Sequence, residues 1–209
     1  GVCERTNSEG EIMVPLDEAD ATNALKALMD RGVDSLGVCF LWSFVNPENE
    51  QKMAELIRKL YPQVSVTLSH DLAPRIGEYE RTSTVALNAA LSPTLSRSLQ
   101  SLKTRVAENG FQKSLLVMQG YGGLLSVPQA TARAVGMIES GPAGGIIGSQ
   151  FVGNLAGMKN IIGCDMGGTS FKVGVITEGA FEYAWESTIH RYHSLIPKID
   201  VVSIGAGGG

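Results

Sequence analysis

The residues best suited to do chemistry lie in one short stretch, Asp165-Met166-Gly167-Gly168-Thr169-Ser170. Apolar runs at 160–164 and 171–176 flank it, which predicts a strand, a tight turn and a second strand. Adjacent glycines let backbone amides approach an anion closely, and successive amides form a concave nest for phosphate. The stretch therefore predicts a hairpin that holds a nucleotide phosphate through Gly167, Gly168 and the Thr169 and Ser170 hydroxyls. Asp165 is the predicted ligand of Mg²⁺, which prefers oxygen. An ordinary Gly-Gly hairpin turn is the alternative.

Other polar segments are weaker candidates. Ser140-Gly141-Pro142-Ala143-Gly144-Gly145 is predicted to join a strand to a helix, where free amides attract anions, although close packing also requires small residues. No Gly-Lys-Ser/Thr follows, so this is not a Walker A loop. His70, which follows a predicted strand, is a candidate ligand or base, although a lone loop histidine is more often structural. His190 and His193 are three residues apart, but a metal site would need further ligands.

Composition limits the classes of function. The 209 residues are 44% hydrophobic and carry a formal net charge of −4, so a packed core is expected. This charge recommends neither nucleic acid nor an anionic membrane as a partner. Cys3, Cys39 and Cys164 are scattered, without a CxxC pair, so neither a zinc site nor a disulfide framework is predicted. Cys39 and Cys164 lie in apolar runs and are expected to be buried, which fits a reducing cytoplasm.

The first part of the chain has the pattern of a parallel α/β unit. A short hairpin is predicted around residues 7–14, and a helix over Glu18–Arg31 with Asp17 as its N-cap. Three predicted elements follow in order. They are a strand in the nearly continuous apolar run at 33–41, a helix from Glu48 to Leu60 and a strand at 64–68. Strand, helix and strand in succession predict a βαβ unit, and hence a parallel sheet.

The second part alternates helices with glycine-rich loops. Residues 78–108 have a helical pattern, and Pro93 predicts a break into two helices near Ser92. Six of the 25 glycines lie before position 111 and 19 lie after it. Because ligands of open α/β sheets bind at strand ends, the first half is interpreted as scaffold and the second as the binding region.

Seven stretches of the chain, in sequence order, form a set that is informative as a whole. They are Pro15-Leu16-Asp17-Glu18, Ser69-His70-Asp71, Glu78-Tyr79-Glu80-Arg81-Thr82-Ser83-Thr84, Leu87-Asn88-Ala89, Ser140-Gly141-Pro142-Ala143-Gly144, Asp165-Met166-Gly167-Gly168-Thr169-Ser170 and Gly205-Ala206-Gly207-Gly208-Gly209. With these stretches the chain resembles the hydantoinase A/oxoprolinase family, the ATP-using subunit of N-methylhydantoinase-type enzymes. Relatives in that family include 5-oxoprolinase and the ATPase subunits of acetone and acetophenone carboxylases.

The resemblance implies an actin-like ATPase fold of the ribonuclease H-like type, with parallel and mixed sheets flanked by helices. We expect an incomplete fragment of it. Residues 1–157 would form the latter part of the first subdomain, and 158–209 the start of the second. ATP and Mg²⁺ are the implied cofactors. Asp165 would be the catalytic and metal-binding residue, and a hydantoinase B-type subunit the partner.

The resemblance also brings the final glycine-rich stretch into the nucleotide site through Gly205, Gly207 and Gly208. Lys172 departs from the family, whose members usually carry Asp there, and it either contacts phosphate or replaces a metal-binding acid. The implied reaction is phosphorylation of a cyclic amide oxygen, followed by hydrolytic ring opening. The alternatives are the ATPase subunit of a ketone carboxylase, which would activate an enol oxygen, and a non-catalytic ATP-binding module of chaperone-like or regulatory type.

Overall fold

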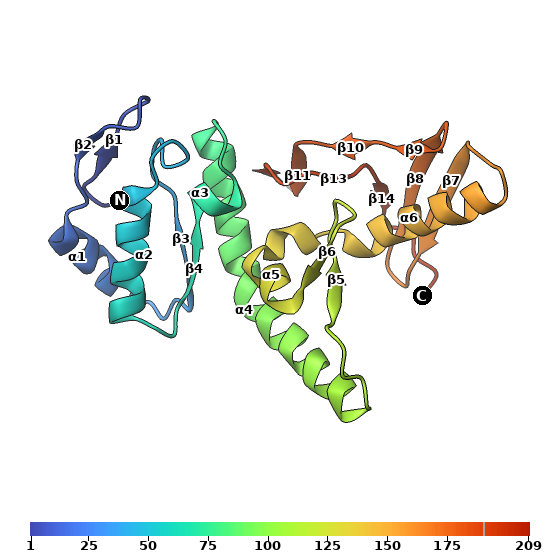
Figure 1. Cartoon of the computed structure of the whole chain (residues 1–209), viewed down its shortest axis with the longest axis horizontal. Coiled ribbons are helices and arrows are strands. Elements are labelled where there is room, and N and C mark those ends of the chain that lie inside the picture. Colours follow the sequence, from blue (N-terminus) through green and yellow to red (C-terminus); the bar gives the residue numbers. More distant parts are fainter. Residues whose placement is uncertain (190) are drawn as a thin grey trace. The chain divides into compact units, whose positions relative to one another are not determined.

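The computed structural model describes residues 1–189 and 191–209, which form two compact units (Figure 1). Unit 1 comprises residues 1–104, 131–135 and 188–195, and unit 2 comprises residues 105–130, 136–187 and 196–209. His190 lies outside the described residues, so the pair with His193 that the sequence suggested stays untested. The subdomain boundary expected between residues 157 and 158 stays a prediction.

Unit 1 opens with a hairpin and a βαβ motif, as the sequence pattern indicated. Its elements up to the long helix are β1 (Arg5–Thr6), β2 (Ile12–Val14), α1 (Glu18–Met29), β3 (Ser35–Val38), α2 (Glu48–Leu60), β4 (Ser65–Leu68) and α3 (Ser69–Leu72). The Asp17 side chain accepts hydrogen bonds from the amides of Ala19 and Asp20, which confirms the predicted N-cap of α1. Strands β3 and β4 pair in parallel, with Ser35 opposite Ser65 and Val38 opposite Leu68.

The core of this motif is apolar and comes from both helices and both strands. Leu25 of α1, Val38 of β3, and Met53 and Ile57 of α2 are buried in one cluster. Because the strands are parallel, their carboxyl ends lie at the same edge, and the chain leaves them at Cys39 and Ser69. Polar residues that follow the two strands are therefore neighbours.

The break predicted at Pro93 is wrong, because α4 (Glu78–Glu108) runs through it. Proline has no amide hydrogen, so it leaves the carbonyl four residues earlier without its helical donor. That carbonyl belongs to Ala89, and the hydroxyl of Ser35 donates to it at 2.7 Å. A hydroxyl on β3 thus replaces the missing helical hydrogen bond, and the helix continues.

Asn88, fully buried in α4, ties three segments of unit 1 together. Its Nδ2 donates to the Thr67 hydroxyl on β4 at 2.9 Å and to the Ala132 carbonyl at 3.0 Å. Its Oδ1 accepts from the Val135 amide at 3.0 Å. One amide side chain therefore satisfies backbone groups of the segment 131–135 that would otherwise be buried without partners.

Unit 2 contains an antiparallel sheet covered on one face by a helix. The elements that follow α4 in the chain are β5 (Leu116–Met118), β6 (Leu124–Ser126), α5 (Val127–Ala132), the 3₁₀ helix η1 (Ala134–Met137), α6 (Ser140–Leu155), β7 (Ile161–Met166), β8 (Phe171–Thr177), β9 (Ala180–Phe181), β10 (Tyr183–Ala184), β11 (Ser187–Ile189), β12 (Tyr192–Ser194), β13 (Lys198–Ile199) and β14 (Val202–Ile204). Of these, β12, most of β11, the end of α5 and the start of η1 belong to unit 1, and the rest belong to unit 2. The strand order is β14-β8-β7, with β9 also paired to β8.

Helix α6 packs closely on β7 and β8 because glycines face it. A Cβ at Gly163 or Gly174 would lie 2.7 or 2.4 Å from the Ile146 side chain. Ile146 is buried with Ile176 and Ile199 in the core of the unit. The other face of this sheet is apolar and exposed at Ile162 and Val175.

The observed structure is α/β, as predicted, but the described strands pair in parallel only at β3 and β4. The strand expected just before Ser140 is wrong. The 3₁₀ helix η1 occupies this region, and Glu139 adopts a left-handed backbone with φ of 59° at the start of α6. Cys164 is exposed rather than buried, because it lies on the uncovered face of the sheet.

Replacing Asn88 by Ala should destabilise the protein by about 2–4 kcal/mol, because the Val135 amide and the Ala132 carbonyl lose their buried partner. The measurement is the midpoint of urea unfolding. Asn109→Ala, at an exposed position just beyond α4, is the matched control and should change stability by less than about 0.5 kcal/mol. Equal midpoints for the two variants would contradict this role of Asn88.

Candidate phosphate site

The stretch from Asp165 to Ser170 forms the hairpin that the sequence predicted. Strands β7 and β8 are antiparallel, with Met166 opposite Phe171 and Asp165 opposite Lys172. The Gly167 amide donates to the Ser170 carbonyl at 3.0 Å and closes the turn. The amides of Gly168 and Thr169 make no hydrogen bond to any residue that the structure describes. Two adjacent donors are therefore available to an anion at the tip of the hairpin.

The glycine-rich segment at residues 205–209 lies against this turn. Strand β14 pairs with β8, with Ile204 opposite Phe171, and so directs the segment along the hairpin. The Gly208 amide donates to the Gly167 carbonyl, and the Gly209 amide donates to the Gly168 carbonyl, both at 3.1 Å. Two stretches that are about 40 residues apart in sequence thus form one backbone surface.

Gly207 permits the closest approach in this surface. A Cβ at this position would lie 2.3 Å from the Gly168 carbonyl oxygen and 2.5 Å from the Thr169 nitrogen, both backbone atoms. A side chain here would push the two segments apart, because backbone cannot move aside as a flexible side chain can. Gly205, by contrast, has open space around its Cβ position.

Two opposite charges lie in one row across the sheet. Asp165, Lys172 and Ser203 are register partners on adjacent strands, so their side chains share the face that carries α6. Lys172 Nζ donates to the Ser170 hydroxyl at 2.6 Å. Within the part of the chain that the structure describes, no ion pair joins Lys172 to Asp165, whose side chain is exposed. Lysine and carboxylate therefore both remain available to a ligand.

The amino-terminal half of α6 lies nearer to the Asp165 end of β7 than its carboxyl-terminal half does. A Cβ at Gly153 would meet Ile161, whereas a Cβ at Gly163 would meet Ile146 and Ser149, so helix and strand run in opposite directions. The Ser140 end of α6, which the sequence also suggested for anion binding, is thus directed toward the hairpin side. Its dipole adds positive potential on the side where phosphate would bind.

The residues present fit a nucleotide phosphate with Mg²⁺. Among the described residues there is no group of three or more His, Cys, Asp and Glu side chains that could hold a metal. Asp165 would therefore contribute one carboxylate, and phosphate oxygens and water would complete the coordination. This arrangement suits Mg²⁺, which keeps several waters and binds through one or two carboxylates plus substrate phosphates.

Sequence reasoning had not placed Ser203 in this row, nor the amides of Gly208 and Gly209 on the turn. Side chains of a strand alternate between its two faces, but this shows that Ser203 lies beside Lys172 only once the register of β14 with β8 is known. Nothing in the sequence indicates which carbonyls the Gly208 and Gly209 amides would bind.

Two family descriptions match the chain. "Hydantoinase/oxoprolinase N-terminal region" matches residues 1–61, and "Hydantoinase/oxoprolinase" matches residues 81–209, more than half of the chain. The chain belongs to the hydantoinase/oxoprolinase family. The resemblance carried by the seven stretches is thereby confirmed.

Relatives in this family have different named activities. The acetophenone carboxylase gamma subunit of Aromatoleum aromaticum is 34% identical over 215 residues, covering 100% of this chain and 29% of the relative. The caprolactamase subunit alpha of Pseudomonas jessenii is 36% identical over 205 residues, covering 98% of this chain and 30% of the relative. The chain thus spans about three tenths of the length of these hydantoinase/oxoprolinase relatives.

Solved structures of the family agree in fold. Nucleotide-free acetone carboxylase, from work on ATP-dependent acetone carboxylation, superposes with a TM-score of 0.87 at 32% identity. This match covers 100% of this chain and 30% of that one. The ATP-dependent caprolactamase from Pseudomonas jessenii superposes with a TM-score of 0.84 at 34% identity, with the same coverage. In the described residues of our chain, no helix has the length and apolar character needed to cross a membrane.

Gly207→Ala should weaken the contact between the hairpin and the final glycine-rich segment. The added methyl group overlaps the Gly168 carbonyl, and such overpacking costs about 1–3 kcal/mol. Gly205→Ala, where the added methyl group meets open space, is the control. Hydrogen exchange of residues 202–209 should accelerate in Gly207→Ala and not in Gly205→Ala. Unchanged exchange in both variants would show that the close contact does not exist in solution.

Proposed function

We propose that this chain carries a phosphate-binding hairpin of an ATP-dependent enzyme that activates the carbonyl oxygen of a cyclic amide. The main support for this proposal is the pair of amides at Gly168 and Thr169, which make no hydrogen bond among the described residues. They lie beside the final glycine-rich segment, which can pack this closely only because residue 207 is glycine. The named relatives support the same class, because caprolactamase and acetone carboxylase are each described as ATP-dependent.

Each residue of the site has a distinct task in this proposal. The amides of Gly168 and Thr169, with the Thr169 and Ser170 hydroxyls, bind phosphate oxygens. Gly167 closes the turn, and the final glycine-rich segment, through Gly205, Gly207 and Gly208, forms the adjoining backbone wall. Asp165 holds Mg²⁺ through its carboxylate, and Lys172 neutralises phosphate charge. ATP, when bound, supplies the phosphoryl group that turns the carbonyl oxygen into a leaving group before hydrolytic ring opening.

A ketone carboxylase subunit is the second candidate, and the acetophenone carboxylase relative favours it. In that reaction the activated oxygen would belong to an enol. Hydrolysis of ATP that requires both bicarbonate and a ketone would distinguish it from lactam-dependent hydrolysis. Stimulation by neither would favour a regulatory ATP-binding module. A hydantoinase B-type partner belongs to the same proposal and is supported by relatives that are named as subunits. The actin-like architecture and a cytoplasmic location are further parts of this proposal.

Asp165→Asn, in the protein with its native flanking sequence, should reduce ATP turnover at least 100-fold and leave the fold intact. The amide keeps the size of the carboxylate but loses the charge that attracts Mg²⁺. The measurement is phosphate release over a range of Mg²⁺ concentrations. Asp200→Asn, at an exposed position on unit 2, serves as the control and should behave as the unchanged protein. Near-normal turnover in Asp165→Asn would remove the metal role.

Lys172→Asp should fold normally, because the residue lies near the start of β8, is only half-buried, and has the Ser170 hydroxyl as its hydrogen-bond partner. Exchanging a cation for an anion beside the turn should weaken binding of metal-free ATP several-fold, because two negative charges then meet. Added Mg²⁺ should recover most of this affinity. Calorimetry with and without Mg²⁺ measures both values, and identical affinities in the two proteins would show that Lys172 does not face phosphate.

A further inference from the structure

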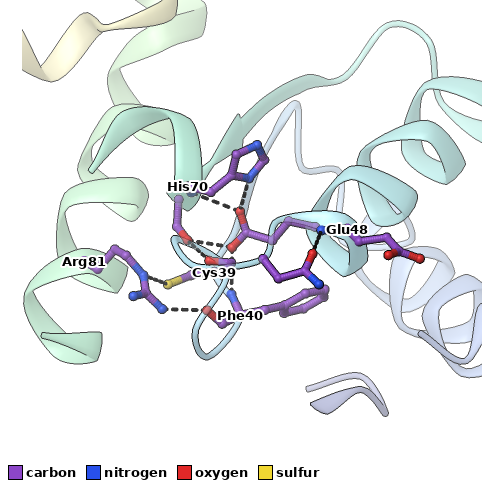
Figure 2. Close-up of polar contacts among 9 residues, drawn as sticks. Cys39, Phe40, Glu48, His70 and Arg81 are labelled. Atoms are coloured by element: carbon purple, nitrogen blue, oxygen red, sulfur yellow. Dashed lines mark hydrogen bonds and ion pairs between the residues drawn. The ribbon is translucent and has the colours of Figure 1, made fainter. Parts of the chain in front are cut away.

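A second polar cluster lies in unit 1, at the carboxyl ends of β3 and β4. Its centre is the carboxylate of Glu50, in α2, which is fully buried. Oε1 accepts hydrogen bonds from the Phe40 amide at 2.8 Å and the Ser69 hydroxyl at 2.6 Å. Oε2 accepts from the His70 amide at 3.1 Å and is 2.7 Å from Nδ1 of the His70 ring (Figure 2). The carboxylate thus fixes the position and the orientation of His70.

This orientation leaves the other ring nitrogen free. Because Glu50 Oε2 accepts a hydrogen bond, Nδ1 carries the hydrogen and Nε2 of the neutral ring carries a lone pair. Nε2 forms no hydrogen bond with any residue that the structure describes, and the side chain is 17% exposed. In Figure 2 the ring edge opposite Glu50 is directed away from the cluster. A buried carboxylate behind an imidazole is the arrangement that holds a histidine as a general base and stabilises its protonated form.

The other buried charge nearby does not neutralise Glu50. Arg81, 1% exposed, donates to the Phe40 carbonyl at 2.5 Å and to Cys39 Sγ at 3.4 Å. The backbone of Phe40 therefore separates the two charges, because its amide donates to Glu50 and its carbonyl accepts from Arg81 (Figure 2). Within the described residues, His70 is the only basic side chain that pairs with Glu50. Protonation of His70 would place a positive charge directly on a buried negative one.

The loop that Glu50 anchors, but not His70 itself, also lines a cavity of about 240 Å³, to which the charged residues Arg5, Glu78 and Arg81 contribute as well. Leu41, Trp42 and Phe44 contribute apolar walls, and Arg81 lies against the Phe44 ring at 5.0 Å from its centroid. Trp42 has a left-handed φ of 57°, an unfavourable conformation for a bulky residue that such loops retain where function requires it.

We propose that His70 is the proton acceptor for the carbonyl substrate, an inference that rests on the proposed function. A lactam carries an N–H, and an enolisable ketone carries a C–H, next to the carbonyl carbon. Nε2 forms a bond to this hydrogen, and the electron pair of the broken N–H or C–H bond becomes a double bond to the carbonyl carbon. The carbonyl π electrons move to oxygen, which becomes a nucleophile that can accept a phosphoryl group. One base in one place therefore serves both substrate classes that the relatives' names indicate.

The test uses the full-length protein with its partner subunit, and caprolactam, 5-oxoproline, acetone and acetophenone as probes. A probe that stimulates ATP hydrolysis is carried forward to the variants. His70→Asn places an amide where Nδ1 lies, so it can still donate to Glu50 but has no Nε2. We expect the probe-stimulated kcat of this variant to fall at least 100-fold, the usual contribution of general base catalysis, with little change in the KM for ATP. Imidazole added to His70→Ala should restore part of the rate.

The control is His193→Asn, because His193 is an exposed histidine of the same unit and its rate should not change. A purely structural His70 would give a His70→Asn variant within threefold of the unchanged protein, and a His70→Ala variant that imidazole does not restore. Either result overturns the proposal and leaves the proposed function standing. If no probe stimulates hydrolysis in the unchanged protein, the proposed function fails, and the role of His70 fails with it.

Discussion

Both units of this protein depend on hydrogen bonds that give partners to most backbone polar groups where the chain leaves a sheet, and the exposed amides of Gly168 and Thr169 are an exception. In unit 1 the chain turns sharply after β3 and β4, and the buried carboxylate of Glu50 binds the amides of Phe40 and His70 there. In unit 2 the hairpin carbonyls of Gly167 and Gly168 receive the amides of Gly208 and Gly209. The acceptor of these amide hydrogen bonds is a charged side chain in unit 1 and backbone carbonyls in unit 2.

This difference suits two kinds of ligand. Backbone amides from glycines form a surface without side chains, which can approach a phosphate closely and carries no preference for the remainder of the molecule. A histidine held by a buried carboxylate acts instead on a single proton and requires its partner at one place. In the functions proposed for them, unit 2 therefore binds phosphate without regard to the rest of the ligand, and unit 1 discriminates between small molecules through the position of one base.

The family to which the chain belongs includes relatives named for lactams and relatives named for ketones. These substrates share a carbonyl oxygen that becomes reactive once a neighbouring hydrogen is removed. A chain that binds phosphate and positions a base, as we propose, would serve both groups. Similar scaffolds with different lining residues commonly support different reactions in this way.

Much of the local structure was determined by sequence alone. Asp17 before a helical pattern, the βαβ order and the glycine hairpin between apolar runs each depend on neighbours in the chain, and each was confirmed. Short-range rules failed where a distant group intervened. Pro93 remains inside α4 because Ser35, 54 residues from Ala89, satisfies the carbonyl that proline leaves free. Cys164 is exposed because no element of the described chain covers its face of the sheet, although its apolar run indicated burial.

The candidate sites divide in the same way. The residue types at Asp165–Ser170 predicted the hairpin, which the structure confirms, and its role in phosphate binding remains a proposal that rests on consecutive glycines and hydroxyls. Only the tertiary structure brought Gly207 against Gly168 and placed Ser203 in the row of Asp165 and Lys172. Likewise, sequence presented His70 as a lone histidine in a loop, because Glu50 lies 20 residues earlier on a helix of ordinary pattern. Parallel pairing of β3 and β4 brings these two side chains together, and a register of this kind cannot be read from either segment alone.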